Sequence, residues 1–221
     1  MAPVVAVFPD LANGLQPRSL PNFTHSTLRN MTMNLPAQTL TIDVDDYLHG
    51  EQESPIRHEY IAGQVYAMAG AGEAHNRISL NIAFHLRAAT RGTPCAVFIS
   101  DMKVRVAAHE AFYYPDVLLT CDPTDRGSLY KAAPCLIAEV LSPSTEMTDR
   151  REKLLAYRTL PSLRYYLLVA QDRRLVEVYR REEDGGWRHE LSDEGALAFD
   201  CGGLALRLTV ADLYEDVVWE T

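Results

Sequence analysis

An acid stands in the middle of an apolar run, and this combination restricts the fold more than any other feature of the sequence. The run CLIAEVL at 135–141 contains one charged side chain, Glu139. Alternate side chains of a strand face opposite sides, so a strand here is apolar on both faces, as is typical of a central, buried strand. An ionised carboxylate in that place is unfavourable unless it is paired or binds a metal. Glu139 therefore predicts a buried ion pair with Arg or Lys, or a functional site, and we expect its pKa to be raised by burial.

A second acid, Asp116, lies at the start of another apolar run, in YYPDVLL. Pro115 has no backbone N–H to donate, so a strand begins there or lies at the edge of a sheet. Taken alone, Asp116 fits a turn residue at the end of a strand. If Glu139 is on a neighbouring strand, the two carboxylates suit a hard divalent cation, Mg²⁺ or alternatively Mn²⁺. Such an ion polarises a phosphodiester and activates water.

A lysine is expected close to the two acids, and the sequence offers two. A helix after Glu139 carries Lys153, which lies about 12 Å along that helix and comes level with Glu139 if the helix folds back over the sheet. The alternative for Lys153 is an exposed pair with Asp149, four residues earlier. Lys103, in DMKVRV, is the rival, and the register of the turn at 107–111 decides which way it faces.

The order of elements predicts an α/β fold around a mixed sheet. Apolar periodicity and turn residues indicate a helix over 41–50, a hairpin turning at Ala62-Gly63, a helix over 73–89, strands over 95–106, 112–120 and 135–141, a helix over 145–160, strands over 165–170 and 175–179, then small strands and a short helix over 210–214. Residues 1–40 show no periodicity and contain five prolines, so we expect a poorly ordered N-terminal extension. The remainder, 41–221, is predicted to form a single domain.

Four runs of the sequence, YPDVLLT, IAEVLSPST, DRREKLLAY and LRYYLLV, resemble the Uma-two family of bacterial restriction endonucleases, which belongs to the PD-(D/E)XK nuclease superfamily. The segment HEYIAGQVYAMAGAGEAHN is similar to the usual opening of that family, and the resemblance covers about residues 41–185. It implies a restriction-endonuclease-like αβββαβ core over residues 73–170. It also implies an Mg²⁺-dependent site that cleaves DNA.

The resemblance also implies roles for particular residues. Asp116 matches the acid of the PD motif, and Glu139 matches the acid of the third motif. Where the superfamily usually has a lysine two residues later, this sequence has Leu141, so Lys153 from the following helix becomes the candidate for the catalytic lysine. Glu59 resembles an acid that opens the family and would add a metal contact, unless it is an exposed strand charge. His75 resembles another family position, and the alternative is a histidine satisfied at the start of a helix.

Charge is distributed unevenly along the chain, which has a net charge of −9. Residues 182–221 hold 11 acids and 2 arginines, whereas residues 139–181 hold 9 basic side chains against 6 acids. The arginines of the second segment are expected to follow a DNA backbone, or else are ordinary solvated charges; they include Arg150, Arg151, Arg158 and Arg164.

The compartment is predicted from what the sequence lacks. No apolar run approaches the roughly 20 residues of a membrane span, and the N-terminal residues do not resemble a secretory signal. The four cysteines are widely spaced and form no CxxC pair, which argues against a zinc site or a disulfide framework and favours a cytoplasmic protein.

Three classes of function remain. A metal-dependent DNA endonuclease is favoured by the pair of acids, and a catalytically inactive nuclease-fold module for DNA binding or interaction is favoured by Leu141. A purely structural protein would require the acids to be ion-paired. A serine hydrolase is disfavoured because no G-x-S-x-G surrounds the serines of LSPST. Since cutting both strands of a duplex usually takes two active sites, we expect a homodimer, with the strand at 175–179 and the acidic C-terminal segment as candidate contacts.

Overall fold

The computed structural model describes residues 41–219. The predicted N-terminal extension, 1–40, lies outside the described residues. The helices, helical turns and strands are, in chain order, α1 (Val44–Glu53), β1 (His58–Ile61), β2 (Gln64–Ala67), α2 (Glu73–Ala89), β3 (Ala96–Ile99), β4 (Lys103–Val106), η1 (Ala107–His109), β5 (Ala111–Tyr113), β6 (Val117–Thr120), β7 (Tyr130–Lys131), β8 (Leu136–Leu141), α3 (Glu146–Thr148), η2 (Asp149–Lys153), α4 (Leu154–Arg158), β9 (Tyr165–Ala170), β10 (Val176–Arg181), β11 (Trp187–Ser192), β12 (Ala196–Cys201), β13 (Leu204–Thr209) and α5 (Val210–Leu213).

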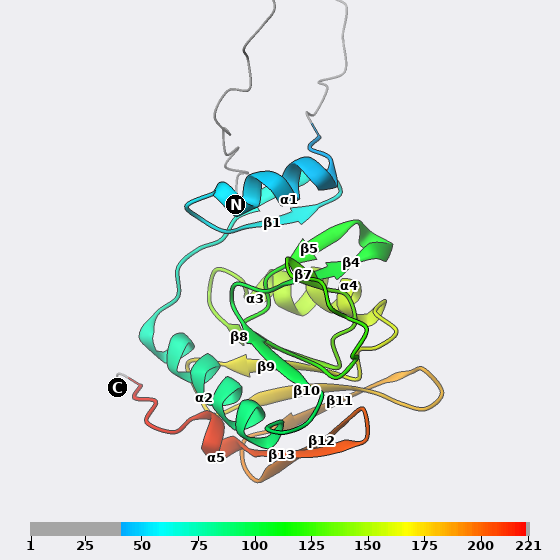
Figure 1. The fold of residues 1–221 in the computed structure, drawn as a ribbon. Coiled ribbons are helices and arrows are strands. Elements are labelled where there is room, and N and C mark those ends of the chain that lie inside the picture. Colours follow the sequence, from blue (N-terminus) through cyan, green and yellow to red (C-terminus); the bar gives the residue numbers. More distant parts are fainter. Residues whose placement is uncertain (1–40, 220–221) are drawn as a thin grey trace, which may run out of the picture.

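The strands of the described part of the chain form two larger sheets and a hairpin. The six-stranded sheet has the order β11-β10-β9-β8-β6-β3, and the five-stranded sheet has the order β2-β1-β5-β4-β7. Figure 1 shows α1 above the five-stranded sheet, and α2, α5 and the β12–β13 hairpin on the far side of the six-stranded sheet. Only β8 and β9 run parallel in the six-stranded sheet, and the segment containing η2 and α4 connects them. The αβββαβ order expected over 73–170 is present as α2, β3, β6, β8, the α3–η2–α4 helix and β9.

Two predicted strands are each divided between the two sheets. The run at 95–106 forms β3 in one sheet and β4 in the other, and the run at 112–120 likewise forms β5 and β6. The mixed sheet expected for the core is therefore the six-stranded one, and the division of the two runs adds a second, five-stranded mixed sheet. The first break lies at Ser100, which has a φ of 38°, and the second at Pro115, which donates no ladder hydrogen bond. The Ser100 N–H donates to the Asp116 carbonyl at 3.1 Å, so the two crossings are joined.

Local sequence signals explain the elements near the N-terminal end. Asp43 caps α1, because its side chain accepts a hydrogen bond from the Asp46 N–H at 2.8 Å. The helix was expected to stop at Gly50 but continues to Glu53. The extra turn places the carboxylate of Glu51 on the buried backbone N–H of His58, at 2.9 Å. The hairpin turns at Ala62 and Gly63 as predicted, and both have a positive φ.

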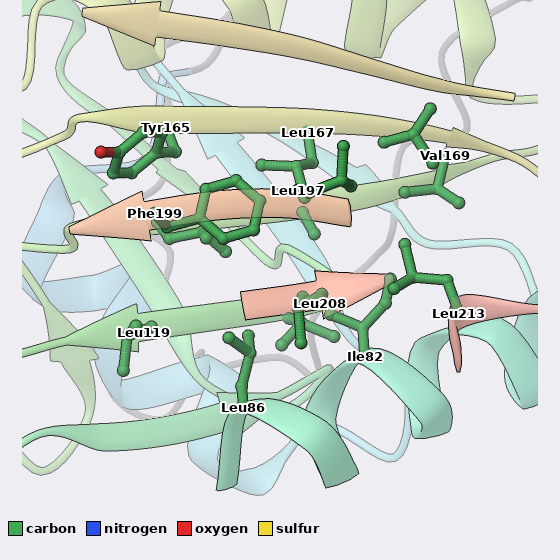
Figure 2. Close-up of a cluster of buried hydrophobic side chains, with 14 of the residues drawn as sticks. Ile82, Leu86, Leu119, Tyr165, Leu167, Val169, Leu197, Phe199, Leu208 and Leu213 are labelled. Carbon is green, nitrogen blue, oxygen red and sulfur yellow. The ribbon is translucent and has the colours of Figure 1, made fainter. Parts of the chain in front are cut away.

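Each face of the six-stranded sheet covers its own core. The larger core lies between the sheet and α2, α5 and the β12–β13 hairpin, and Figure 2 shows Ile82 and Leu86 projecting into it from α2. The other core lies between the sheet, α4 and strands β4 and β5, and it contains Ile137, Leu141 and Tyr157. Because both faces are covered, β8 is buried along its whole length, as its apolar sequence predicted.

The four cysteines form two disulfides, Cys95–Cys121 and Cys135–Cys201. The expectation that they form no disulfide framework was wrong. Spacing in the sequence did not show the pairing because tertiary structure creates it. Ala96 lies opposite Thr120 in β3 and β6, so Cys95 and Cys121 are the next pair along. Cys135, just before β8, is joined to Cys201 at the end of β12 in the hairpin. The cysteines therefore give no support to a cytoplasmic location, which stays a prediction.

The strand first suggested as a dimer contact lies inside a sheet. Its residues form β10, which is paired with β9 on one side and β11 on the other. Both edges of β10 are therefore occupied, so a second chain can contact it only through side chains, and its part in a dimer stays a prediction. Among residues 41–219, no helix is both long and apolar enough to cross a membrane.

Replacing Leu86 by alanine is expected to lower the free energy of unfolding by about 2–5 kcal/mol, because Leu86 is fully buried in the larger core. Leu155→Ala is the control: Leu155 is mostly exposed on α4, and its loss should change stability by less than about 0.5 kcal/mol. Urea denaturation measures both. Equal effects of the two substitutions would contradict the assignment of α2 to this core.

Candidate active site

Asp116 and Glu139 face each other across two neighbouring strands. Val117 of β6 is paired with Ala138 of the antiparallel β8, so Asp116 and Glu139 form the next pair in register. The Val140 N–H donates to Asp116 Oδ2 at 2.7 Å, and the Asp116 N–H donates to Glu139 Oε2 at 3.3 Å. The first bond ties the Asp116 carboxylate to the backbone of β8, and the second ties the Glu139 carboxylate to the backbone of Asp116, so both carboxylates lie at the same point of the sheet.

The helix after β8 brings Lys153 to this point. Its middle part, η2, is a π-helical turn, a form that occurs mostly as single turns, frequently at functional sites. Lys153 Nζ lies 3.3 Å from Glu139 Oε1, 3.3 Å from Asp149 Oδ1 and 2.9 Å from Glu59 Oε1. The ammonium is thus buried among three carboxylates that come from β8, η2 and β1.

Glu59 reaches the cluster from β1 of the five-stranded sheet, and its role as a metal ligand stays a prediction. Besides its ion pair with Lys153, its Oε1 accepts a hydrogen bond from the Tyr114 N–H at 3.2 Å. Tyr114 immediately precedes the Pro115-Asp116 segment, so Glu59 links the lysine to the chain that carries Asp116. It is not the exposed strand charge of the alternative interpretation, since its side chain is largely buried.

Lys103, the rival lysine, does not reach the two acids. It lies on β4 in the five-stranded sheet, and its Nζ donates to Tyr114 Oη at 3.0 Å. Leu141, at the position where the superfamily usually carries its lysine, is buried in the apolar core beneath α4. Of the three positions considered for the lysine, the structure brings only 153 to Glu139.

Three residues join the site that the sequence analysis did not place there. Asp149 was considered only as an exposed partner of Lys153, yet it is buried. Tyr157 donates from its hydroxyl to Glu139 Oε1 at 3.1 Å. The signal was the spacing of Asp149, Lys153 and Tyr157, which are four residues apart and therefore share one face of a helix. His75, which resembles a family position or else is a satisfied histidine at a helix start, lies with Nε2 3.2 Å from Asp116 Oδ2.

The site contains more carboxylates than cations. Burial raises the pKa of Glu139 well above its usual value, and the ammonium of Lys153 offsets this only in part. Burial likewise raises the pKa of Asp149 against the effect of Lys153. For Lys153, burial alone would lower the pKa, but Glu139, Glu59 and Asp149 together raise it well above the ordinary value. Lys153 is therefore a fixed positive charge rather than a proton acceptor at neutral pH.

The neighbouring histidine is affected by the same acids. Burial acts to lower the pKa of His75, but its hydrogen bond to Asp116 and the Asp116 charge raise it overall. Even with His75 protonated, four carboxylates face two cations. Because burial raises the pKa of Glu139 and Asp149, protons offset this imbalance, and a further cation that binds here would displace them.

The donor set fits Mg²⁺ in the form in which proteins usually bind it. In the described part of the chain, no three His, Cys, Asp or Glu side chains form a ready-made metal cluster. Mg²⁺ does not require one, because it is usually held by one or two carboxylates and keeps several waters. Asp116 Oδ1 accepts no hydrogen bond from any residue in 41–219, and its side chain is 18% exposed, against 4% for Glu139. The Asp116 side of the site is therefore the open one.

The chain resembles known proteins over most of its length. Residues 44–211 match the protein family Uma2, whose description is "putative restriction endonuclease". Two uncharacterized proteins of Synechocystis sp. (strain ATCC 27184 / PCC 6803 / Kazusa) are similar: slr1290 is 38% identical over 65% of this chain and 76% of its own length, and sll1609 is 34% identical over 70% and 89%. A crystal structure of a putative nuclease belonging to DUF820, from Anabaena variabilis ATCC 29413, superposes with a TM-score of 0.60 at 19% identity, over 77% of this chain and 98% of that one.

Replacing Lys153 by methionine should leave three buried carboxylates without their shared cation. We expect the free energy of unfolding to fall by about 3–5 kcal/mol near neutral pH. Without the ammonium, Glu139 and Asp149 hold protons in the folded state that they release on unfolding, so the variant's stability should decrease as pH rises from about 5 to 8.

Denaturation of wild type and variant at several pH values measures this slope. Lys103→Met is the control, because Lys103 is equally buried but does not sit among the four acids. A Lys153→Met variant whose stability deficit is independent of pH would show that the lysine does not compensate the carboxylates.

Proposed function

The chain belongs to the Uma2 family, described as putative restriction endonucleases, and on that premise we propose that it is a metal-dependent endonuclease that hydrolyses phosphodiester bonds of DNA. The fold is that of the restriction-endonuclease-like nucleases, which is the fold the structural neighbour shares. Fold alone does not determine function, so the proposal rests on the chemistry of the site.

One observation carries the proposal: two carboxylates on adjacent strands and a fixed ammonium converge at a single, partly open point. The Asp116 N–H donates to Glu139, the Val140 N–H donates to Asp116, and Lys153 Nζ lies 3.3 Å from Glu139 Oε1. Phosphodiester hydrolysis needs positive charge near the attacked phosphate and a water held for attack. Asp116 and Glu139 supply ligands for a metal ion that would bring the positive charge. The Lys153 ammonium lies beside the place of the attacking water.

Asp116 and Glu139 are the residues that would hold Mg²⁺ or Mn²⁺. When bound, the ion would polarise the phosphate and lower the pKa of water. The chain's own part is to hold the two carboxylates in register by the β6–β8 pairing and to bury Glu139 away from competing solvent. The Tyr157 hydroxyl occupies one oxygen of Glu139, which orients the carboxylate toward Asp116.

Lys153 would stabilise the negative charge that develops on the phosphate in the transition state. Its ammonium is held from three sides by Glu59, Glu139 and Asp149, so it is preorganised and does not need to reorient during the reaction. In this role a lysine supplied by the helix replaces the one that is absent at Leu141.

DNA is the proposed partner, although the arginines differ in how available they are. Arg150 pairs with Glu146 and Glu177, and Arg158 lies over the ring of Trp187. Arg151 and Arg164 are exposed and form no ion pair with any residue in 41–219. These last two are the better candidates for phosphate contacts.

A second candidate function is a nuclease-fold module that binds DNA or another partner without cutting it. It is favoured by Leu141 and by the closed ion cluster, in which Lys153 already has three partners. The two candidates differ in one result, since only the enzyme cleaves DNA when the metal is supplied.

Millimolar Mn²⁺ is expected to raise the Tm of the wild-type protein, because a ligand that binds only the folded state stabilises it by mass action. Asp116→Asn should abolish the shift. Asp193→Asn, at an exposed acid far along the chain in a loop, should keep it. A shift of equal size in all three proteins would place the ion elsewhere, and no shift in the wild type would remove the proposed metal site.

Lys153→Met is expected to lower the rate of plasmid cleavage in Mg²⁺ by about 10² or more, because the ammonium acts mainly in the transition state. The assay should be run at a temperature where circular dichroism shows the variant folded. DNA affinity should remain within about threefold of wild type, as measured by fluorescence anisotropy.

Lys103→Met serves as the matched buried lysine and should cleave at close to the wild-type rate. If Lys103→Met abolishes cleavage while Lys153→Met retains it, the lysine has been misassigned. If the wild-type protein cleaves no DNA with either metal, the binding module becomes the better description.

A further inference from the structure

The six-stranded sheet ends in a strand without any charge. In the described part of the chain, β3 pairs with β6 alone, so the backbone groups along its outer edge have no ladder partner. Its sequence is AVFI. Natural proteins usually protect such edges with charged side chains, Pro or a bulge, and β3 has none of these.

The opposite edge of the same sheet has the usual protection. There β11 carries Arg188 and Glu190, and Arg188 pairs with both Glu190 and Glu182. The contrast shows that the two edges differ in what they can accept. An uncharged, unpaired strand is suited to pairing with another strand, whereas the charged edge resists it.

An apolar face continues from this edge onto the adjoining helix. Leu80 and Phe84 lie one turn apart on α2 and are 59% and 64% exposed, and Ile99 at the end of β3 is 50% exposed. Val97 and Ile99 project on the α2 side, because they lie opposite Leu119 and Val117 of the larger core.

A groove of about 430 Å³ lies between the helix and the strand, and it is flanked by opposite charges. Its lining residues are Ala83, Arg87, Val97, Phe98, Ile99, Asp101 and Met102. Arg87 stands in the last turn of α2, and Asp101 lies just beyond the other end of β3. The Asp101 side chain contacts Arg57 at 3.0 Å but is 75% exposed, so it can accept a second cation.

We propose that this face binds a second copy of the same chain, with β3 pairing antiparallel to its two-fold mate and the two α2 helices side by side. A two-fold axis makes the interface self-complementary. Antiparallel pairing places the beginning of each β3 against the end of the other, so Arg87 of each copy faces Asp101 of the other copy. The two sheets become one continuous sheet, and Leu80, Phe84 and Ile99 are covered.

The positions of Arg87 and Asp101 favour a second copy of the chain over an unrelated partner. A surface with a basic group at one end and an acidic group at the other, across an apolar centre, is complementary to itself when it is turned by two-fold symmetry. The dimer would also bring two active sites into one particle. The proposed dimer does not depend on nuclease activity, because its test measures only the mass and the association of the chains.

The test is a charge exchange on the full chain. The wild type should elute at micromolar concentration with the mass of two 24.8 kDa chains in light scattering. Arg87→Glu and Asp101→Arg each create two like-charge contacts in a homodimer, and each should raise the dissociation constant by about tenfold or more. A mixture of the two variants pairs opposite charges at both contacts and should form the heterodimer at close to wild-type affinity.

Two further variants exclude a nonspecific effect of surface charge. Phe84→Lys should give a monomer, while Leu191→Lys, at an equally exposed leucine on the charged β11 edge, should leave the dimer intact. A monomeric wild type overturns the proposal. So does a dimer that Leu191→Lys breaks and Phe84→Lys spares, or a mixture of the exchange variants that stays as weak as either alone.

Discussion

The ammonium of Lys153, surrounded by three carboxylates, is the interaction on which the arrangement of this protein depends. It joins β8, the π-helical turn η2 and the β1–β2 hairpin of the five-stranded sheet through Glu139, Asp149 and Glu59, respectively. Buried ions are stable only when their partners compensate them, so each of these elements fixes the position of the others. The same compensation is incomplete, because four acids face the lysine and His75. The same set of buried acids therefore holds the elements together through Lys153 and supplies the ligands for the proposed metal ion.

The site lies where the chain passes between the two sheets. After β5 the chain leaves the five-stranded sheet, and at Tyr114-Pro115-Asp116 it enters the six-stranded sheet as β6. The backbone at this crossing is held by Glu59 from one sheet and by Glu139 from the other. A crossing with hydrogen bonds to both sheets is rigid, and rigidity is what a site for metal and phosphate requires.

The sequence predicted most of what depends on local pattern and little of what depends on pairing between distant segments. The buried strand with Glu139, the helix over 73–89 and the convergence of Asp116 with Glu139 followed from periodicity and from the unfavourable energy of an unpaired buried charge. The division of the run at 95–106 did not, because the turn at Ser100 has no distinctive residue, whereas Pro115 already indicated the start of a strand within the run at 112–120. The disulfides and the burial of Asp149 also escaped prediction, since each depends on contacts made by tertiary packing.

The most direct test is anomalous diffraction from crystals soaked in Mn²⁺. The surplus of buried carboxylates predicts one strong anomalous peak between Asp116 and Glu139, within about 2.0–2.3 Å of an oxygen from each, with Lys153 still in contact with Glu139. A peak at a distant surface acid, or no peak while Lys153 and His75 alone face the four carboxylates, would contradict the account.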